Sequence, residues 1–448
     1  MIASSGASHK RLAHRINELA RGHGAETHYT HTSVANWCER GMTPRWPVPR
    51  LLAQAVAEAL GRPVSVAELG MSAPAAAQDT GLEFSRDRAE ALRVATEYWS
   101  AVDRRDFLAR SGFAIASFNT PVTRWLVKPA EEPQEHFGGR HVGAGDVEEL
   151  RLAAREASRW DSRYGGGNWK SSSVTDCLYR RAVPLLHGSY TARVGQELLS
   201  ATAELGRVAG WIAFDTERHA LAQRHFIQSL RLAREAGDTQ LGCYVLTTMA
   251  MQATQRGYLS EAVDMAQGAY ERSEHSTAPR VLAFAKVIEA KALARARDKK
   301  AALAALDRAR VLLDTAETSD RPDEDPQWIA FFTPARIAAD AIEIYADLRM
   351  PRAVLTWEPR AAAIAPQHFS RCVGIRLAIV AQAHAQAGHI DESVRVGYQS
   401  LGILNRVEST RAKVYIHRLA TDLSSQRREP DVRAFLHAVR GTDRPVPA

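Results

Sequence analysis

Apolar side chains recur at helical spacing near the start of the chain. In the segment "HKRLAHRINELA", Leu12, Ile16 and Leu19 fall at positions i, i+4 and i+7, which places them on one face of a helix. Ser8 precedes this segment and is the expected N-cap, because its side-chain oxygen can accept a backbone N–H. The sequence "RGHG" after the last apolar position ends the pattern. These features predict an amphipathic helix that begins at His9.

A second helical pattern lies in "YTHTSVANWCERGMTP". Thr30 is the expected N-cap, and Val34 and Trp37 are three residues apart and point the same way. Gly41 is placed to end the helix, and Pro44 prevents its continuation. We therefore expect a short helix between Thr30 and Gly41.

Further helices are expected downstream. Leu52, Val56 and Leu60 share one face of a predicted helix over residues 49–60, and Val66 and Leu69 indicate a short helix after it. The next stretch, "MSAPAAAQDTG", is rich in proline and alanine and is typical of a linker.

These helices resemble the helix-turn-helix of the phage-repressor (Xre) class. "SHKRLAHRINELA" matches the first helix of the motif, and "THTSVANWCERG" matches the recognition helix. In that class the recognition helix lies in the major groove and phosphate contacts orient the protein. By position, the resemblance implies base contacts from His31, Thr32, Ser33 and Asn36 and phosphate contacts from Lys10, Arg40 and Arg45. Asn36 is the most informative of them, because an amide can form two hydrogen bonds with adenine.

Two departures from the class pattern bear on this interpretation. The class carries a whole helix before the motif, whereas seven residues precede Ser8, so a lost first helix and an upstream start both remain open. The loop from Arg21 to Tyr29 is longer than the usual tight turn. The alternative for residues 1–70 is a small helical bundle with solvated polar faces.

Small residues recur at a step of 40 in the second half of the chain. They take offsets 0, 12 and 19, which are the marks of a tetratricopeptide repeat, in which two antiparallel helices approach closely. A longer step of 51 residues separates the third and fourth units. The positions are Gly210, Ala222 and Ser229; Ala250, Ala262 and Ala269; Ala290, Ala302 and Ala309; Ala341 and Ala353; and Ala381, Ser393 and Ser400.

The array predicts an α-solenoid with a concave face lined by the first helix of each unit. We expect additional helices at 148–160 and 192–208 before the units, and at 414–423 and 430–440 after them. The residues expected to face inward are Arg207, Trp211, Tyr244, Thr247, Gln255, Lys291, Tyr345 and Gln382. Such aromatic, amide and basic groups suit a peptide or an acidic ligand; the alternative is that they pack or are solvated.

A stretch between the two patterned regions resembles an export signal. Arg104 and Arg105 precede a short apolar run, as in a twin-arginine signal, but about a hundred residues come before them. Leu92, Ala95 and Trp99 share one helical face, so a linker helix that packs on the array is the favoured interpretation, and we expect a cytoplasmic protein. The predicted domains are a helix-turn-helix domain at 1–70, a linker at 71–84, a helical connector at 85–145 and a repeat domain at 146–448.

Composition narrows the function. Hydrophobic residues make up 45% and charged residues 24% of the 448-residue chain, which is ordinary for a globular protein, and no apolar stretch is long enough to span a membrane. The net charge of +7 suits a nucleic-acid partner. The four cysteines lack zinc-ligand spacing, and we find no nucleophile elbow, Walker loop or HExxH motif. We therefore expect no enzyme activity, metal or cofactor.

Two short motifs have simple structural interpretations. Gly165, Gly166 and Gly167 do not form a phosphate-binding pattern and are interpreted as a flexible turn between helices. The acidic run at 320–326 is interpreted as a solvated loop rather than a metal site.

The expected fold is all-α, with an N-terminal helix-turn-helix domain followed by an α-solenoid of tetratricopeptide-like repeats. This pairing resembles actinobacterial, particularly streptomycete, regulators of development and secondary metabolism and, more distantly, the peptide-sensing regulators of Firmicutes. The resemblance implies a dimeric transcriptional regulator that binds double-stranded DNA, with a peptide, small molecule or protein partner in the repeat groove. The alternative is a repeat scaffold that binds protein partners without reading DNA.

Overall fold

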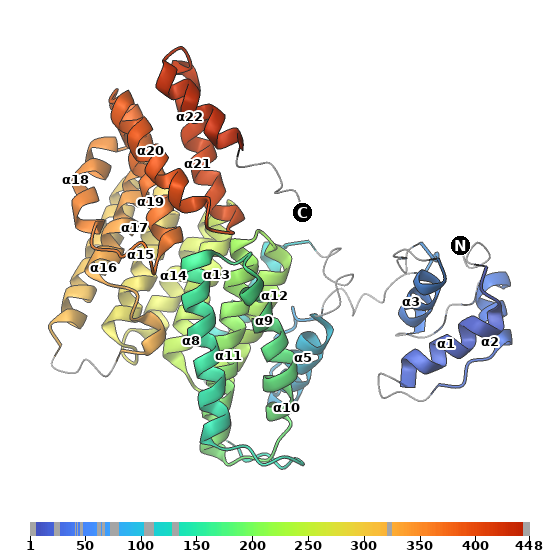
Figure 1. Ribbon diagram of the computed structural model, residues 1–448. Helices are drawn as coiled ribbons and strands as arrows, with labels where there is room; N and C mark the ends of the chain where they lie inside the picture. Colours follow the sequence, from blue (N-terminus) through green and yellow to red (C-terminus); the bar gives the residue numbers. More distant parts are fainter. Residues whose placement is uncertain are drawn as a thin grey trace. The chain divides into compact units, whose positions relative to one another are not determined.

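The computed structural model describes residues 6–21, 27–40, 42, 44, 48–60, 64, 68–71, 80–102, 112–127, 134–319 and 325–441. Within these residues the regular elements are helices, and the only other pairing is two isolated β-bridges, so the predicted all-α class is confirmed. The described residues form two compact units, divided between Thr80 and Gly81. In Figure 1 the first unit is blue and the second runs from teal to red.

The first unit contains three described helices around one small core. They are α1 (His9–Arg21), α2 (His31–Glu39) and α3 (Val48–Leu60). α1 packs against both of the others, and the predicted apolar positions of all three helices form the core, including the fully buried Ile16, Val34 and Leu52. The three helices predicted up to residue 60 are confirmed, whereas residues 68–70 of the short helix predicted after them form a turn. Gly41 and Val66 lie outside the described residues.

Local hydrogen bonds fix where these helices begin. The Ser8 hydroxyl accepts the backbone N–H of Arg11 at 3.2 Å, as expected of an N-cap. The Asn17 side chain, on α1, donates to the carbonyl of Tyr29 at 2.8 Å and accepts its N–H at 3.0 Å. One polar side chain of α1 therefore holds the segment that leads into α2.

The second unit is dominated by helices packed in consecutive pairs (Figure 1). The sequence predicted this pairing. The helix expected separately at 192–208 is the first part of the long α11. The two helices expected at 414–423 and 430–440 form a sixth pair. The pairs are α11 (Ala192–Asp215) with α12 (His219–Glu235), α13 (Thr239–Gln255) with α14 (Leu259–Ser273), α15 (Pro279–Arg295) with α16 (Lys299–Glu317), α17 (Pro334–Asp347) with α18 (Pro351–Ala361), α19 (Ser370–Gln386) with α20 (Ile390–Leu404), and α21 (Thr410–Leu423) with α22 (Pro430–Gly441).

Small residues let the helices of each pair approach closely. A Cβ added at Gly210 on α11 would lie 2.5 Å from the ring of Phe226 on α12. Ala250, Ala290 and Ala381 occupy the matching positions of later pairs and are fully buried. Of the small residues that define the predicted step, Ala353 alone is half-buried rather than buried. The 40-residue step therefore reflects close helix packing.

The turn inside each of the first five pairs repeats the same backbone device. One residue adopts a positive φ, and the N–H of the next residue returns to a carbonyl in the last turn of the first helix, as in a Schellman motif. Steps of 40 residues separate the first three of these positions, as they separate the small residues. The positive-φ residues are Glu217, Gly257, Arg297, Arg349 and Gly388.

Additional elements precede the pairs. They are α5 (Arg88–Val102), the 3₁₀-helix η2 (Ile115–Phe118), α7 (Asn119–Val127), α8 (Ala144–Tyr164), α9 (Trp169–Cys177), the π-helix η3 (Leu178–Ala182) and α10 (Val183–Leu186). α5 packs on α12, where the indole N–H of Trp99 donates to His225 Nδ1 at 3.3 Å. Leu92, Ala95 and Trp99 are buried, as their shared face predicted. Arg104 and Arg105 lie outside the described residues.

No described helix is long and apolar enough to cross a membrane.

Candidate functional site

The first helices of the pairs, together with α8, surround a cavity in the second unit. The cavity has a volume of about 100 Å³ and is partly open to solvent. Its lining comes from α8, α11, α13, α15, α17, α19 and α21, in agreement with the predicted concave face. Trp211, Gln255 and Lys291 line this cavity, as expected of inward-facing residues.

Three other predicted groove residues are buried in helix packing and do not line the cavity. The guanidinium of Arg207 stacks over the ring of Tyr244 at 4.7 Å. Trp328 also stacks on the ring of Tyr244 at 4.8 Å, and Phe284 and Phe331 pack against it. Thr247 is fully buried and donates its hydroxyl to a backbone carbonyl of its own helix. Packing is the structural role of these residues.

The remaining two predicted residues also contact other parts of the array. Tyr345 packs beside Trp357 with ring centroids 6.0 Å apart. The amide of Gln382 donates to the carboxylate of Asp422 at 2.5 Å. Neither lines the cavity.

One polar cluster in the cavity wall is centred on Lys291. Its ammonium lies 2.6 Å from the Asp340 carboxylate and 2.7 Å from that of Glu343. The Tyr415 hydroxyl donates to Glu343 at 2.6 Å, and Arg295 lies 3.6 Å from it. Burial would raise the pKa of Glu343, but Lys291 and Arg295 outweigh burial and hold that pKa well below its usual range. The Lys291–Glu343 pair is therefore charged at neutral pH.

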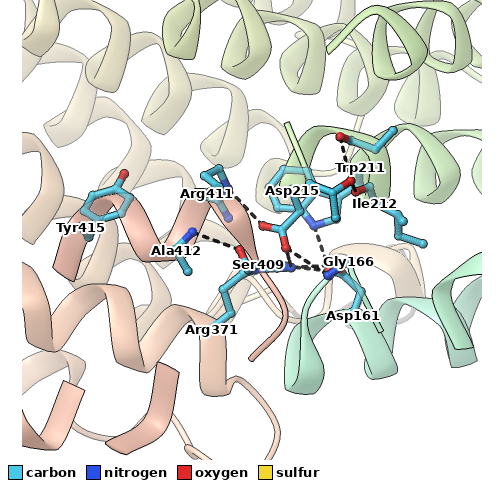
Figure 2. A network of polar contacts seen from close by, with 12 residues as sticks. Asp161, Gly166, Trp211, Ile212, Asp215, Arg371, Ser409, Arg411, Ala412 and Tyr415 are labelled. Carbon is cyan, nitrogen blue, oxygen red and sulfur yellow. Dashed lines mark hydrogen bonds and ion pairs between the residues drawn. The ribbon is translucent and has the colours of Figure 1, made fainter. Parts of the chain in front are cut away.

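A second cluster joins helices far apart in the sequence (Figure 2). Arg371 on α19 donates two hydrogen bonds to Asp161 on α8, at 2.8 and 2.6 Å. The same guanidinium lies 2.9 Å from Asp215, at the end of α11. All three side chains are buried. The cluster connects the first helices of the unit with the helices near its C-terminus.

Neighbouring groups complete this second cluster. Arg411 on α21 pairs with Asp215 at 3.2 Å, and the indole of Trp211 donates to Asp161 at 2.9 Å. Burial would raise the pKa of Asp215, but Arg371 and Arg411 outweigh burial and lower it. Both carboxylates are thus satisfied by charged and neutral donors, as buried charges require.

The glycine triplet forms a tight turn beside this cluster. The N–H of Gly167 donates to the carbonyl of Glu408 at 2.7 Å, and Glu408 donates back to Tyr164 at 2.7 Å. A Cβ at Gly165 would lie 2.5 Å from the Glu408 carbonyl oxygen. The prediction of a turn between helices is confirmed, but its role is to let two backbone segments touch rather than to provide flexibility.

Arg376 differs from the other cationic residues of the cavity wall. It lies on α19, is 6% exposed and lines the cavity. Among the described residues, its Nε and Nη1 have no hydrogen-bond partner. Burial lowers its pKa below the usual range, and Glu358 attracts it without an ion pair in the described part of the chain. The side chain of Arg336, in contrast, pairs with Asp340 at 3.1 Å.

The predicted DNA-contact residues lie on the first unit. His31 and Thr32 are exposed at the start of α2, and Asn36 is half-buried one turn further on. Ser33 is half-buried, and its hydroxyl accepts the N–H of Thr30 at 3.2 Å. Thr30 is thus the N-cap that the sequence predicted, and the Ser33 hydroxyl already has a structural partner.

The predicted phosphate contacts are only partly described. Lys10 on α1 and Arg40 after α2 are exposed. Arg45 lies outside the described residues. Within the described residues, neither Lys10 nor Arg40 forms an ion pair, whereas Arg15 pairs with Glu58 at 2.7 Å.

The acidic run predicted as a loop is described only at its end. Asp325 pairs with Arg280 at 2.5 Å, so this carboxylate is anchored to α15. Residues 320–324 lie outside the described part. In the described residues, no three His, Cys, Asp or Glu side chains are grouped as a metal site.

Sequence reasoning did not single out Asp161, Asp215, Arg371 or Arg376. Arg371 and Arg376 lie on α19 outside the three repeat positions that the sequence pattern used, and Asp161 lies before the array. A charged residue within a helix usually faces solvent. The one available signal was the placement of Arg371 and Arg376 on the first helix of a unit, which is the helix expected to line the groove.

The comparisons with known proteins bear on the first unit. A family model described as the SP15 N-terminal domain matches residues 1–72. No curated protein and no solved structure matches the chain. The matched residues include all three helices described in the first unit.

Proposed function

We propose that this protein is a sequence-specific, DNA-binding transcriptional regulator that acts in the cytoplasm as a dimer. The first unit is the proposed reader, with α1 and α2 as the two helices of a helix-turn-helix. The observation that carries the proposal is the start of α2, where His31 and Thr32 are exposed while Val34 of the same helix is buried in the core. Such a helix offers polar side chains to a groove from a fixed support.

The chemistry of this surface suits DNA. His31, Thr32 and Asn36 carry hydrogen-bonding groups of the kind that read base edges. Lys10 and Arg40 are exposed cations without an ion pair in the described part of the chain, so they are available for phosphate. Because Ser33 already accepts the Thr30 N–H, we assign it to the support of the helix rather than to specificity.

The second unit is proposed to be a tetratricopeptide-like solenoid that dimerises, senses a ligand, or does both. Its paired helices and the cavity lined by their first helices support this assignment. A ligand would act by favouring one arrangement of the two DNA-binding units over another. The resemblance to streptomycete regulators supports a role in development or secondary metabolism.

The test of base reading uses a sequence that the full chain selects from random duplex DNA. His31→Ala combined with Asn36→Ala is expected to remove most of the preference for that sequence, since each base contact contributes about 1–3 kcal/mol of discrimination. Weak binding that depends on salt should survive, because phosphate contacts supply it. His14→Ala is the matched control, since His14 is an exposed histidine of α1.

Competition between the selected duplex and a scrambled duplex provides the measurement. An unchanged preference in the double variant would contradict the assignment of α2 to the groove. If the full chain enriches no sequence, the proposal fails and the scaffold alternative takes its place.

A further inference from the structure

Among the described residues that line the cavity of the second unit, one buried cation has no ion-pair partner. Lys291, Arg295, Arg336, Arg371 and Arg411 each form an ion pair with a buried or half-buried carboxylate. Arg376 lines the same cavity, is 6% exposed and forms no ion pair within the described residues. Glu358 attracts Arg376 from a distance, but no carboxylate of the described residues contacts its guanidinium.

An unpaired buried charge is unfavourable. Desolvation of an ionised side chain costs several kcal/mol unless an opposite charge or hydrogen bonds compensate for it. Arg371, five residues earlier on α19, shows what compensation looks like, because Asp161 and Asp215 both contact it. No comparable group reaches the Nε and Nη1 of Arg376 in the described part of the chain. These two nitrogens are buried without a partner, so the guanidinium at the cavity wall keeps a charge that its neighbours do not compensate with hydrogen bonds at these atoms.

The surroundings of Arg376 indicate what else such a ligand carries. Apolar side chains alternate with the charged ones along the lining. The apolar lining comes from Ile375 and Ile379 of α19, from Phe369 at the N-cap of that helix, and from Ile288 of α15. A ligand that contacts this wall would bury an apolar body beside its charged group.

The closure of the array limits the size of the ligand. The network of Asp161, Arg371 and Asp215 joins α8 and α11 to α19, and Arg411 adds α21 (Figure 2). The concave face is thus bounded by its own first and last helices, and the cavity between them has a volume of about 100 Å³. These bounds suit a small molecule.

We propose that this cavity binds a small organic anion that pairs one carboxylate or phosphate group with Arg376 and lays an apolar body against Phe369, Ile375 and Ile379. One charged group is expected because the other cations of the wall already have carboxylate partners. The proposal concerns binding to the second unit and does not depend on the proposed DNA binding.

The first arm of the test compares two buried arginines of α19 by thermal unfolding of the full chain. Arg376→Met should leave the melting temperature unchanged or raise it, because the variant removes a buried charge that has no ion pair in the described part of the chain. Arg371→Met should lower it, because two buried carboxylates lose their partner. If Arg376→Met lowers the melting temperature as much as Arg371→Met, Arg376 has a structural role and the proposal is overturned.

The second arm measures binding directly by calorimetry. The probes are 4-phenylbutyrate and phenyl phosphate, compared with the uncharged 4-phenylbutan-1-ol. At least one anion should bind the unaltered protein tenfold or more tightly than the alcohol, and Arg376→Met should remove that preference. Arg352→Met, which removes an exposed arginine of α18, is the control and should keep it.

Two results of this arm would overturn the proposal. One is that neither anion binds more tightly than the alcohol. The other is that the preference for the anion survives in Arg376→Met. Because the experiment contains no DNA, its failure would leave the proposed DNA binding of the first unit unaffected. A failure to find specific DNA binding would likewise leave the proposed anion site unaffected.

Discussion

Replacing Arg371 with methionine tests how the second unit is held closed. The substitution removes the two hydrogen bonds to Asp161 and the contact with Asp215, and it keeps most of the apolar volume of the side chain. Asp215 retains Arg411 and the N–H of Gly166. Asp161 retains the indole of Trp211 alone among the described donors. Most of the loss should therefore arise at Asp161.

The magnitude follows from the burial of the three groups. Asp161 is 2% exposed, Asp215 is fully buried and Arg371 is 7% exposed. Removing one partner of such a buried pair typically costs about 3–5 kcal/mol, because the other charge stays desolvated. Adding Asp161→Asn to Arg371→Met removes the stranded charge at nearly constant shape. We expect the double variant to recover more than half of the lost stability.

Urea unfolding followed by circular dichroism gives the size of the effect, and amide hydrogen exchange gives its location. Repeat arrays open in segments, so exchange separates the ends of the array from its middle. Exchange should accelerate in α8 and α21 together, because the cluster joins the two ends. The middle helices α13 to α15 should change less.

Either of two results would refute this reasoning. A loss below about 1 kcal/mol would mean that the cluster behaves like an exposed ion pair. Faster exchange confined to α19 would mean that the cluster does not join the two ends of the array.

Two further predictions concern burial and packing in the second unit. Burial raises the pKa of Glu204 from 4.5 to about 7, so the folded state binds a proton more tightly than the unfolded state. The free energy of unfolding should therefore fall by about 3 kcal/mol as the pH rises from about 4.5 to 7. Glu204→Gln should remove this pH dependence, and identical pH slopes of the melting temperature between pH 5 and 8 in the variant and the unaltered protein would contradict the prediction. Gly210→Ala should lower the free energy of unfolding by about 1–3 kcal/mol, because the added Cβ would clash with the ring of Phe226. Gly402→Ala, at an exposed helical site with nothing within 4 Å, should raise the free energy of unfolding by about 0.5–1 kcal/mol. Urea unfolding measures both changes, and equal effects would argue against close packing at Gly210.

Local patterns of the sequence predicted the helices well. Ser8 and Thr30 could be placed as N-caps because a cap depends on a few neighbouring residues. The small residues at Gly210 and its repeats marked the helix pairs because a close helix crossing admits no larger side chain. Both features depend on contacts within one helix pair or one turn, and such contacts leave a periodic trace.

The polar clusters left no such trace. Arg371 and Asp161 are 210 residues apart, and their contact exists only because α19 packs on α8 in the folded unit. Arg207 and Tyr244 do not line the cavity for a related reason, since Trp328 and Phe331, from the segment between the third and fourth pairs, pack against the ring of Tyr244, and Arg207 stacks on that ring. Arg376 stands out because no carboxylate of the described residues contacts its guanidinium. The sequence cannot reveal such an absence, because it depends on the positions of all the neighbouring side chains.

The measurement that tests the central claim most directly is the selection of genomic DNA fragments by the purified full chain at two salt concentrations. A sequence-specific regulator should enrich one recurring sequence that persists at the higher salt, and paired half-sites at a fixed spacing would follow from a dimer. Recovery of unrelated fragments that disappears as salt rises would reflect attraction by net charge alone, and it would contradict the proposal that α2 reads DNA.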